Sequence, residues 1–174
     1  MELARKIVDV HGLTDYDRGL TFNVGTVKGG VVPNAVPDFA EAGIDVRCMT
    51  VEQIAEAKEK LEEVAARTYI DGTSTELIYM SSFLPMEQTP DNERLFDYVA
   101  QIYRDMGLPE PSMEFSGGGS DSAFSVMAGV PTVDQMGVKG EWNHSDREYA
   151  LADSIFERAK VLAACVLNIG RFEG

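Results

Sequence analysis

Hydrophobic residues alternate with polar or small residues along two stretches of the first half of the chain. Leu20, Phe22 and Val24 follow this period-two pattern, which is typical of a half-buried strand near residues 20–27. The alternation returns over residues 40–48, after a segment whose glycines and prolines would interrupt a strand. The sequence therefore predicts two strands that each bury one face.

Helical spacing follows the second predicted strand. Thr50 and Gln53 have the spacing of a capping box, and the apolar positions after them recur at helical intervals among charged neighbours. Residues 75–80 then show the β-branched and aromatic bias of another strand. The first ten residues place apolar side chains on one helical face without an N-cap, which predicts the end of a helix whose beginning is absent. Residues 1 to about 86 are thus expected to form an α+β unit.

The second half of the chain alternates between helices, a strand and loops. Thr89 and Pro90 are suited to begin a helix, and Gly107 is suited to end it. A strand is predicted over residues 130–136, and a long helix with an apolar stripe is predicted from about Leu151. This order of elements is typical of α/β layers.

Charge and composition exclude some classes of function. The chain has 29 acidic and 15 basic residues, a net charge of −14, and no basic block that could follow a phosphate backbone, so nucleic acid is not an expected partner. An acidic excess is also what solubility alone favours, and it identifies no function by itself. The chain has no apolar run of membrane-spanning length and no secretory signal, so we expect a cytoplasmic protein that does not bind a membrane.

The two cysteines, Cys48 and Cys165, lie far apart within apolar patterns. Their spacing is not that of a metal-binding or redox pair. We expect both to be reduced core residues.

His144 is the first candidate for chemistry, because it lies in a polar loop close to Asp146 and Glu148, which could orient its ring. A loop histidine beside carboxylates suits a metal ligand or a general base. The alternative is an exposed loop histidine with no function. A zinc site needs three or four ligands, and His11, beside Gly12 at a helix end, is a poor second one.

Three further features could contact a substrate. Residues 116–124, SGGGSDSAF, join three glycines to a helix start whose backbone N–H groups could bind an anion. Such turns are common, and Ser120 lacks the GxSxG sequence that surrounds a nucleophilic serine. Asn34 lies between two prolines in a rigid loop, and Arg47 lies on the polar face of a strand, where it could bind a carboxylate. The alternatives are a turn-forming asparagine and a surface ion pair.

Four segments, taken in order, carry a resemblance to a known family. They are GGVVPNAVPDFAEAGIDVR, SGGGSDSAF, AGVPTVDQMG and NHSDREY. In this order they resemble the zinc exopeptidases and amidohydrolases that include glutamate carboxypeptidase, aminoacylase, acetylornithine deacetylase and succinyl-diaminopimelate desuccinylase. The glutamate carboxypeptidase branch is the most similar, and the resemblance covers nearly the whole chain.

The resemblance implies a fold and an incomplete metal site. In the family an α+β lid with an antiparallel sheet mediates dimerisation, and residues 1–86 match most of it, while residues 87–174 match the C-terminal α/β part of the catalytic domain. Two zinc ions activate a water in this family, and His144 matches the final ligand. The other ligands and the general base are expected upstream of Met1, so this chain alone is expected to be inactive. We expect a homodimer formed through the lid.

The resemblance also implies residues that bind the substrate rather than perform chemistry. Asn34, Arg47, Gly118 and Gly119 match such positions, and the expected substrate is a peptide or an N-acyl amino acid with a free carboxylate. Phe83 stands where the glutamate carboxypeptidases carry an arginine, which puts a preference for glutamate in doubt. The main hypothesis is a fragment of an enzyme that hydrolyses an amide or peptide bond next to this carboxylate. The alternative is a non-catalytic dimerisation or ligand-binding module derived from the family.

Overall fold

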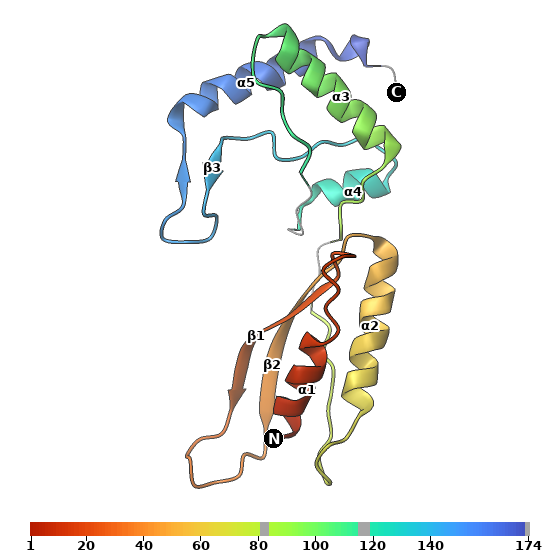
Figure 1. Ribbon diagram of the computed structural model, residues 1–174, viewed down its shortest axis with the longest axis vertical. Coiled ribbons are helices and arrows are strands. Elements are labelled where there is room, and N and C mark those ends of the chain that lie inside the picture. The colour runs from red at the N-terminus through yellow and green to blue at the C-terminus, as the bar shows by residue number, and fades with distance from the viewer. Residues whose placement is uncertain (81–83, 115–118, 173–174) are drawn as a thin grey trace. The chain divides into compact units, whose positions relative to one another are not determined.

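The computed structural model describes residues 1–80, 84–114 and 119–172 (Figure 1). The chain divides into two compact units. The first comprises Met1–Glu87 and Ser116–Ala123, and the second comprises Gln88–Phe115 and Phe124–Gly174. The mixed α/β class expected from the sequence is confirmed, with small antiparallel sheets and helices.

The first unit is built on an antiparallel hairpin of β1 (Thr21–Gly29) and β2 (Ala40–Arg47). Thr21 pairs with Arg47 at one end of the hairpin, and Gly29 pairs with Ala40 at the other, next to the connecting loop. A bulge lies in β1 between Val24 and Thr26. Both strands predicted from the alternating pattern are confirmed.

Helices α1 (Glu2–His11) and α2 (Val51–Ala66) pack their apolar sides against the hairpin (Figure 1). The core of the unit is formed by Val10, Leu20, Phe22, Ala57, Leu61 and Val64. The capping box predicted at the start of α2 is confirmed. The side chain of Thr50 accepts a hydrogen bond from the backbone N–H of Gln53, and the side chain of Gln53 accepts one from the backbone N–H of Thr50. This reciprocal cap fixes where α2 leaves the hairpin.

The strand predicted over residues 75–80 is not formed. Leu77 packs against the core of the first unit, and the hydroxyl of Tyr79 donates to Glu62 Oε1 at 3.0 Å. The segment thus lies along α2 without joining the sheet. Residues with a high strand propensity form a strand only where a neighbouring strand offers hydrogen bonds. In the part of the chain that the structure describes, no strand pairs with this segment.

The second unit has α3 (Pro90–Asp105) and α5 (Ala152–Leu167) as its main helices. The Thr89 side chain caps α3 as predicted, and Gly107 follows its end with φ +69°, a conformation that glycine adopts without strain. The unit also contains α4 (Ser122–Met127, which straddles the division), the short strands β3 (Gly140–Glu141) and β4 (Tyr149–Ala150), and the turn η1 (Ile169–Arg171). Its core comprises Val99, Ile102, Tyr103, Val161 and Cys165.

The strand predicted over residues 130–136 is also not formed. Its backbone is held at one point by Asn92 of α3, whose side-chain oxygen accepts from the N–H of Thr132 at 2.9 Å. Within the described ranges no strand lies beside it to form a ladder. The strand predicted here is therefore wrong, although most of these residues are half-buried.

Both cysteines are free thiols, with Cys165 buried and Cys48 half-buried, as expected of reduced core residues. Burial raises the pKa of each thiol. In the described ranges, no helix combines the length and the apolar character needed to cross a membrane.

Candidate functional site

His144 lies in the loop that joins β3 to β4, and its side chain is exposed. Its backbone has φ +65°, in the left-handed region that few residues other than glycine and asparagine adopt. Its N–H donates to Oε2 of Glu148 at 3.2 Å, so the predicted proximity of His144 and Glu148 is seen at the backbone. Trp142, two residues earlier, has φ +64°.

The loop around His144 is closed by a compact set of contacts. The carbonyl oxygen of Trp142 accepts from the backbone N–H of Ser145 at 3.1 Å and from its hydroxyl at 2.7 Å. The guanidinium of Arg147 lies 4.0 Å from the centre of the Trp142 ring, in a cation–π arrangement. These contacts hold His144 in an uncommon backbone conformation, and such conformations are frequent at binding sites.

A complete metal site is not present in the part of the chain that the structure describes. No group of three or more His, Cys, Asp or Glu side chains converges there. A structural zinc site needs four protein ligands and a catalytic one usually three, so His144 is at most one ligand of such a site.

Asn34 and Arg47 lie at opposite ends of the β1–β2 hairpin. Asn34 is exposed in the connecting loop of residues 30–39, and Arg47 ends β2 at the far end of the ladder. The seven residue steps of β2 span about 23 Å at the usual rise of a strand. Nε of Arg47 contacts Oδ2 of Asp45 at 3.1 Å in an exposed ion pair. Arg47 thus forms a surface ion pair, which was the alternative to a role in substrate binding.

Two of the predicted positions, Gly118 and Phe83, lie outside the described residues. Gly119 is exposed just before α4. The hydroxyl oxygen of Ser120 accepts from the backbone N–H of Ser122 at 3.1 Å, which places Ser120 in a local turn.

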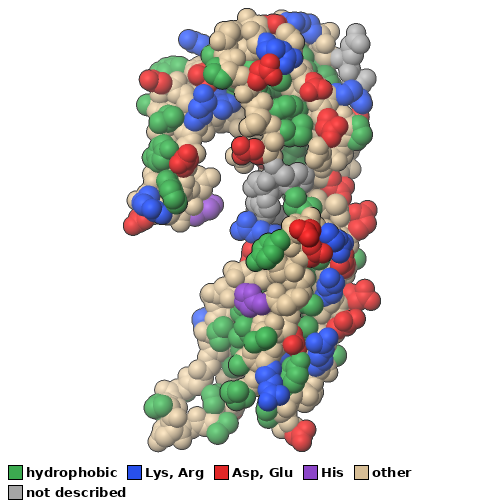
Figure 2. All heavy atoms as spheres, viewed as in Figure 1, with side chains coloured by type: hydrophobic (Ala, Val, Ile, Leu, Met, Phe, Trp, Pro, Cys, Tyr) green, Lys and Arg blue, Asp and Glu red, His purple; other side chains and the backbone are tan. Residues whose placement is uncertain are grey.

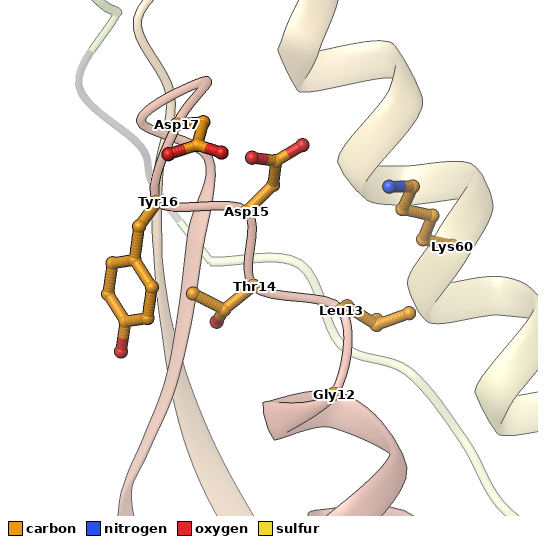
Figure 3. A pocket seen from close by; sticks show the side chains of 7 residues that line it. All are labelled: Gly12, Leu13, Thr14, Asp15, Tyr16, Asp17 and Lys60. Atoms are coloured by element: carbon orange, nitrogen blue, oxygen red, sulfur yellow. The ribbon is translucent and has the colours of Figure 1, made fainter.

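A surface hollow that the sequence did not suggest lies beside the turn after α1. It is lined by residues 12–17 and by Lys60 of α2, with the side chains of Asp15 and Asp17 at one end (Figure 3). Its only signal in the sequence is the turn-forming run DYDRG. Lys60 Nζ pairs with Oε1 of Glu56 at 2.9 Å. The hollow contains no histidine, cysteine or glutamate among its lining residues, and we assign it no chemistry.

The carboxylate of Glu56 is the most strongly perturbed acid near this hollow. Two hydrogen bonds from the guanidinium of Arg18, at 2.9 and 2.6 Å, and the ammonium of Lys60 lower the pKa of Glu56 to about 2. The ion pair between Arg18 and Glu56 links the turn after α1 to α2. On the face seen in Figure 2, acidic and basic side chains are interspersed along the first unit.

Comparisons with known proteins identify the class of the first unit. Residues 1–73 match the peptidase dimerisation domain family. Carboxypeptidase G2 of a Pseudomonas species is 26% identical over 171 residues, which cover 98% of this chain and 41% of that protein. Most of the first unit is therefore similar to a peptidase dimerisation domain.

Solved structures extend the likeness to the whole chain. A tripeptidase of Staphylococcus aureus has 26% identity and a TM-score of 0.70, and the match covers 96% of this chain and 43% of that one. A dinuclear metal-binding peptidase of the M20 family from Bacillus subtilis has 17% identity and a TM-score of 0.69, a likeness of fold that covers 96% of this chain and 44% of that one. The chain spans less than half the length of the relatives it matches.

Proposed function

We propose that the chain is the dimerisation lid and the C-terminal catalytic part of a metal-dependent exopeptidase or amidohydrolase, with the lid over residues 1–86 and the catalytic part over residues 87–174. The parent protein would hydrolyse an amide or peptide bond next to a free carboxylate. The observation that carries the proposal is the similarity to carboxypeptidase G2 over 98% of the chain, in which the loop of His144 is included. A cytoplasmic location and zinc as the metal are part of this proposal.

His144 is proposed as one metal ligand of the parent protein. Its ring is exposed, and the contacts of Glu148, Ser145 and Trp142 fix its backbone. Two zinc ions would supply a water activated for attack on the scissile carbonyl. Because the described residues do not form a complete site, the remaining ligands and the general base would come from polypeptide outside this chain. This chain alone is expected to be inactive.

Asn34, Arg47, Gly118 and Gly119 are proposed to bind the substrate, a peptide or an N-acyl amino acid. Arg47 is accessible, and its guanidinium could exchange Asp45 for a substrate carboxylate, since both present the same pair of oxygens. Exposed Asn34 could donate its amide to a carbonyl oxygen. These residues would position the substrate.

The test is a substitution in the full-length protein, with the chain's other histidine as the matched control. We expect His144→Ala to lower both the zinc content measured by mass spectrometry and the rate of hydrolysis of an N-acyl amino acid. His11→Ala, at the exposed end of α1, should change neither. Full zinc content and full turnover in His144→Ala would refute the ligand assignment.

One observation favours a second function, a dimerisation or ligand-binding module without catalysis. The matched family is a dimerisation domain, and the described residues lack a three-ligand cluster. Under both proposals copies of the chain associate through the lid. Light scattering of the 174-residue chain should give the mass of a dimer, and zinc titration of the same chain should show no tight stoichiometric site. Tight zinc binding together with turnover would contradict both proposals for this chain.

A further inference from the structure

The β1–β2 hairpin (Figure 1) carries an exposed ion pair between Asp45 and Arg47 at the end of β2. Side chains alternate between the two faces of a strand, and Ile44 and Val46 pack against the core of the first unit. Asp45 and Arg47 therefore share the opposite face, where their side chains are 60% and 55% exposed. A ligand can reach both charged groups without a rearrangement of the hairpin.

The contact between the two side chains uses only part of the guanidinium. Oδ2 of Asp45 accepts a hydrogen bond from Nε of Arg47 at 3.1 Å. In the described ranges the guanidinium forms no further hydrogen bond. Because a guanidinium presents its N–H donors in a planar fork, the contact at Nε leaves the two Nη groups available. Arg47 therefore has free donors for a second carboxylate while Asp45 stays beside it.

The residues across the ladder from this pair carry no charge. Thr21 pairs with Arg47, and Asn23 pairs with Asp45. Side chains directly opposite each other on two antiparallel strands lie about 4.5–5.5 Å apart at their Cβ atoms, so these are the nearest cross-strand neighbours. On this face of the hairpin, the charge that a ligand meets beside Arg47 is therefore that of Asp45.

A carboxylate bound by Arg47 has the carboxylate of Asp45 as its neighbour, whether it takes the free Nη groups or displaces Asp45 from Nε. Asp45 would repel a second carboxylate on the same ligand and attract a cationic group. The net charge of −14 acts in the same direction. The pair is thus complementary to a ligand that carries one carboxylate and one cationic group.

We propose that Asp45 sets the charge preference of the proposed hydrolase. It favours an N-acyl amino acid or peptide in which the residue with the free carboxylate has a cationic side chain, such as lysine, and it disfavours an acidic side chain, such as glutamate. Arg47 binds the free carboxylate, and Asp45 binds the cationic group of the side chain. The unfavourable contact with a second carboxylate contributes to the selectivity as much as the favourable one does. The inference rests on the proposed role of Arg47 in substrate binding.

The test compares substrates whose side chains differ in charge but little in size. Nα-acetyl-lysine is paired with N-acetylnorleucine, and N-acetylglutamate is paired with N-acetylglutamine. In the full-length protein, kcat/KM should be higher for the lysine than for the norleucine substrate, and lower for the glutamate than for the glutamine substrate. Asp45→Asn should lower the first ratio and raise the second, each by up to about fivefold, because exposed ion pairs are weak. High salt should reduce both differences in the unmodified protein, since it screens exposed charges.

The matched control is Glu41→Gln, because Glu41 forms an exposed pair with Lys28 at 3.3 Å toward the other end of the same hairpin. This substitution should change neither ratio. Each ratio compares two substrates on one preparation, so it does not depend on the fraction of the variant that folds. Equal ratios in Asp45→Asn and the unmodified protein would overturn the inference.

Arg47→Ala tests the proposed function separately from the inference. It should lower kcat/KM for all the N-acyl amino acids alike, because each has the free carboxylate that Arg47 is proposed to bind. A loss in Arg47→Ala with unchanged ratios in Asp45→Asn would overturn the charge preference alone. Unchanged kcat/KM in Arg47→Ala would overturn the role of Arg47 in substrate binding, and the inference with it.

Discussion

The ammonium group of Lys6 in α1 donates a 2.8 Å hydrogen bond to the carbonyl oxygen of Val64 in the last turn of α2. It donates a second one to Ala65 at 2.9 Å and contacts Glu2 at 3.4 Å, while only 4% of Lys6 is exposed. The last carbonyls of a helix have no partners within it and carry the negative end of its dipole. A lysine on α1 therefore caps α2.

Replacing Lys6 should destabilise the first unit. In Lys6→Met the length and apolar stem of the side chain are kept, but the buried carbonyls of α2 lose their donor, which costs about 1–3 kcal/mol. Urea unfolding followed by circular dichroism measures the change. Lys28→Met is the control, because Lys28 forms an exposed pair with Glu41 at 3.3 Å and such pairs contribute about 0–1 kcal/mol. Equal effects of the two substitutions would contradict the capping role.

Acid should weaken the contact between α2 and the turn after α1. Hydrogen bonds from Arg18 and Lys60 lower the pKa of Glu56 to about 2 from an ordinary value of 4.5. A carboxyl group with a lowered pKa stabilises the fold above its unfolded pKa, and this contribution is lost as the pH falls from about 4.5 toward 2. Glu56→Gln should therefore flatten the decline of the urea midpoint between these pH values, while Glu63→Gln, exposed on the same helix, should not. An unchanged slope in Glu56→Gln would rule out this pair as a source of acid sensitivity.

The packing of the second unit depends on Val161. Its side chain is fully buried in α5 against α3, so Val161→Ala leaves a cavity and should cost about 2 kcal/mol. Val166 on the same helix is 65% exposed, and Val166→Ala should cost less than about 0.5 kcal/mol. Amide exchange of α3 and α5 reports this unit separately from the first. Similar exchange in the two variants would show that Val161 is not a core position.

Local signals in the sequence were sufficient to predict the helices and the hairpin. The cap formed by Thr50 and Gln53 and the alternation after Leu20 involve neighbours along the chain, and the structure confirms both. The strands predicted over residues 75–80 and 130–136 were wrong, because a strand needs a neighbouring strand to pair with and a local sequence pattern does not reveal one. The capping role of Lys6 was missed for the same reason, since the carbonyl groups that it caps lie 58 and 59 residues away.

The candidate site shows the same limit. The polar loop of His144 was recognisable from NHSDREY, but its left-handed backbone and the stacking of Arg147 on Trp142 were not. Asn34 and Arg47 are 13 residues apart in sequence and looked like parts of one binding site. Only the register of β1 and β2 shows that they lie at opposite ends of a hairpin.

This separation predicts how Asn34 and Arg47 act in the full-length protein. Substitutions of residues about 20 Å apart that do not contact each other usually have additive effects on free energy. If each contributes to substrate binding as proposed, Asn34→Ala and Arg47→Ala should each lower kcat/KM, and the double variant should lose the product of the two factors. The double-mutant cycle with an N-acyl amino acid measures this, and Asp45→Ala checks that freeing Arg47 from its ion pair does not itself lower kcat/KM. A coupling energy above about 0.5 kcal/mol would contradict independent action of the two side chains.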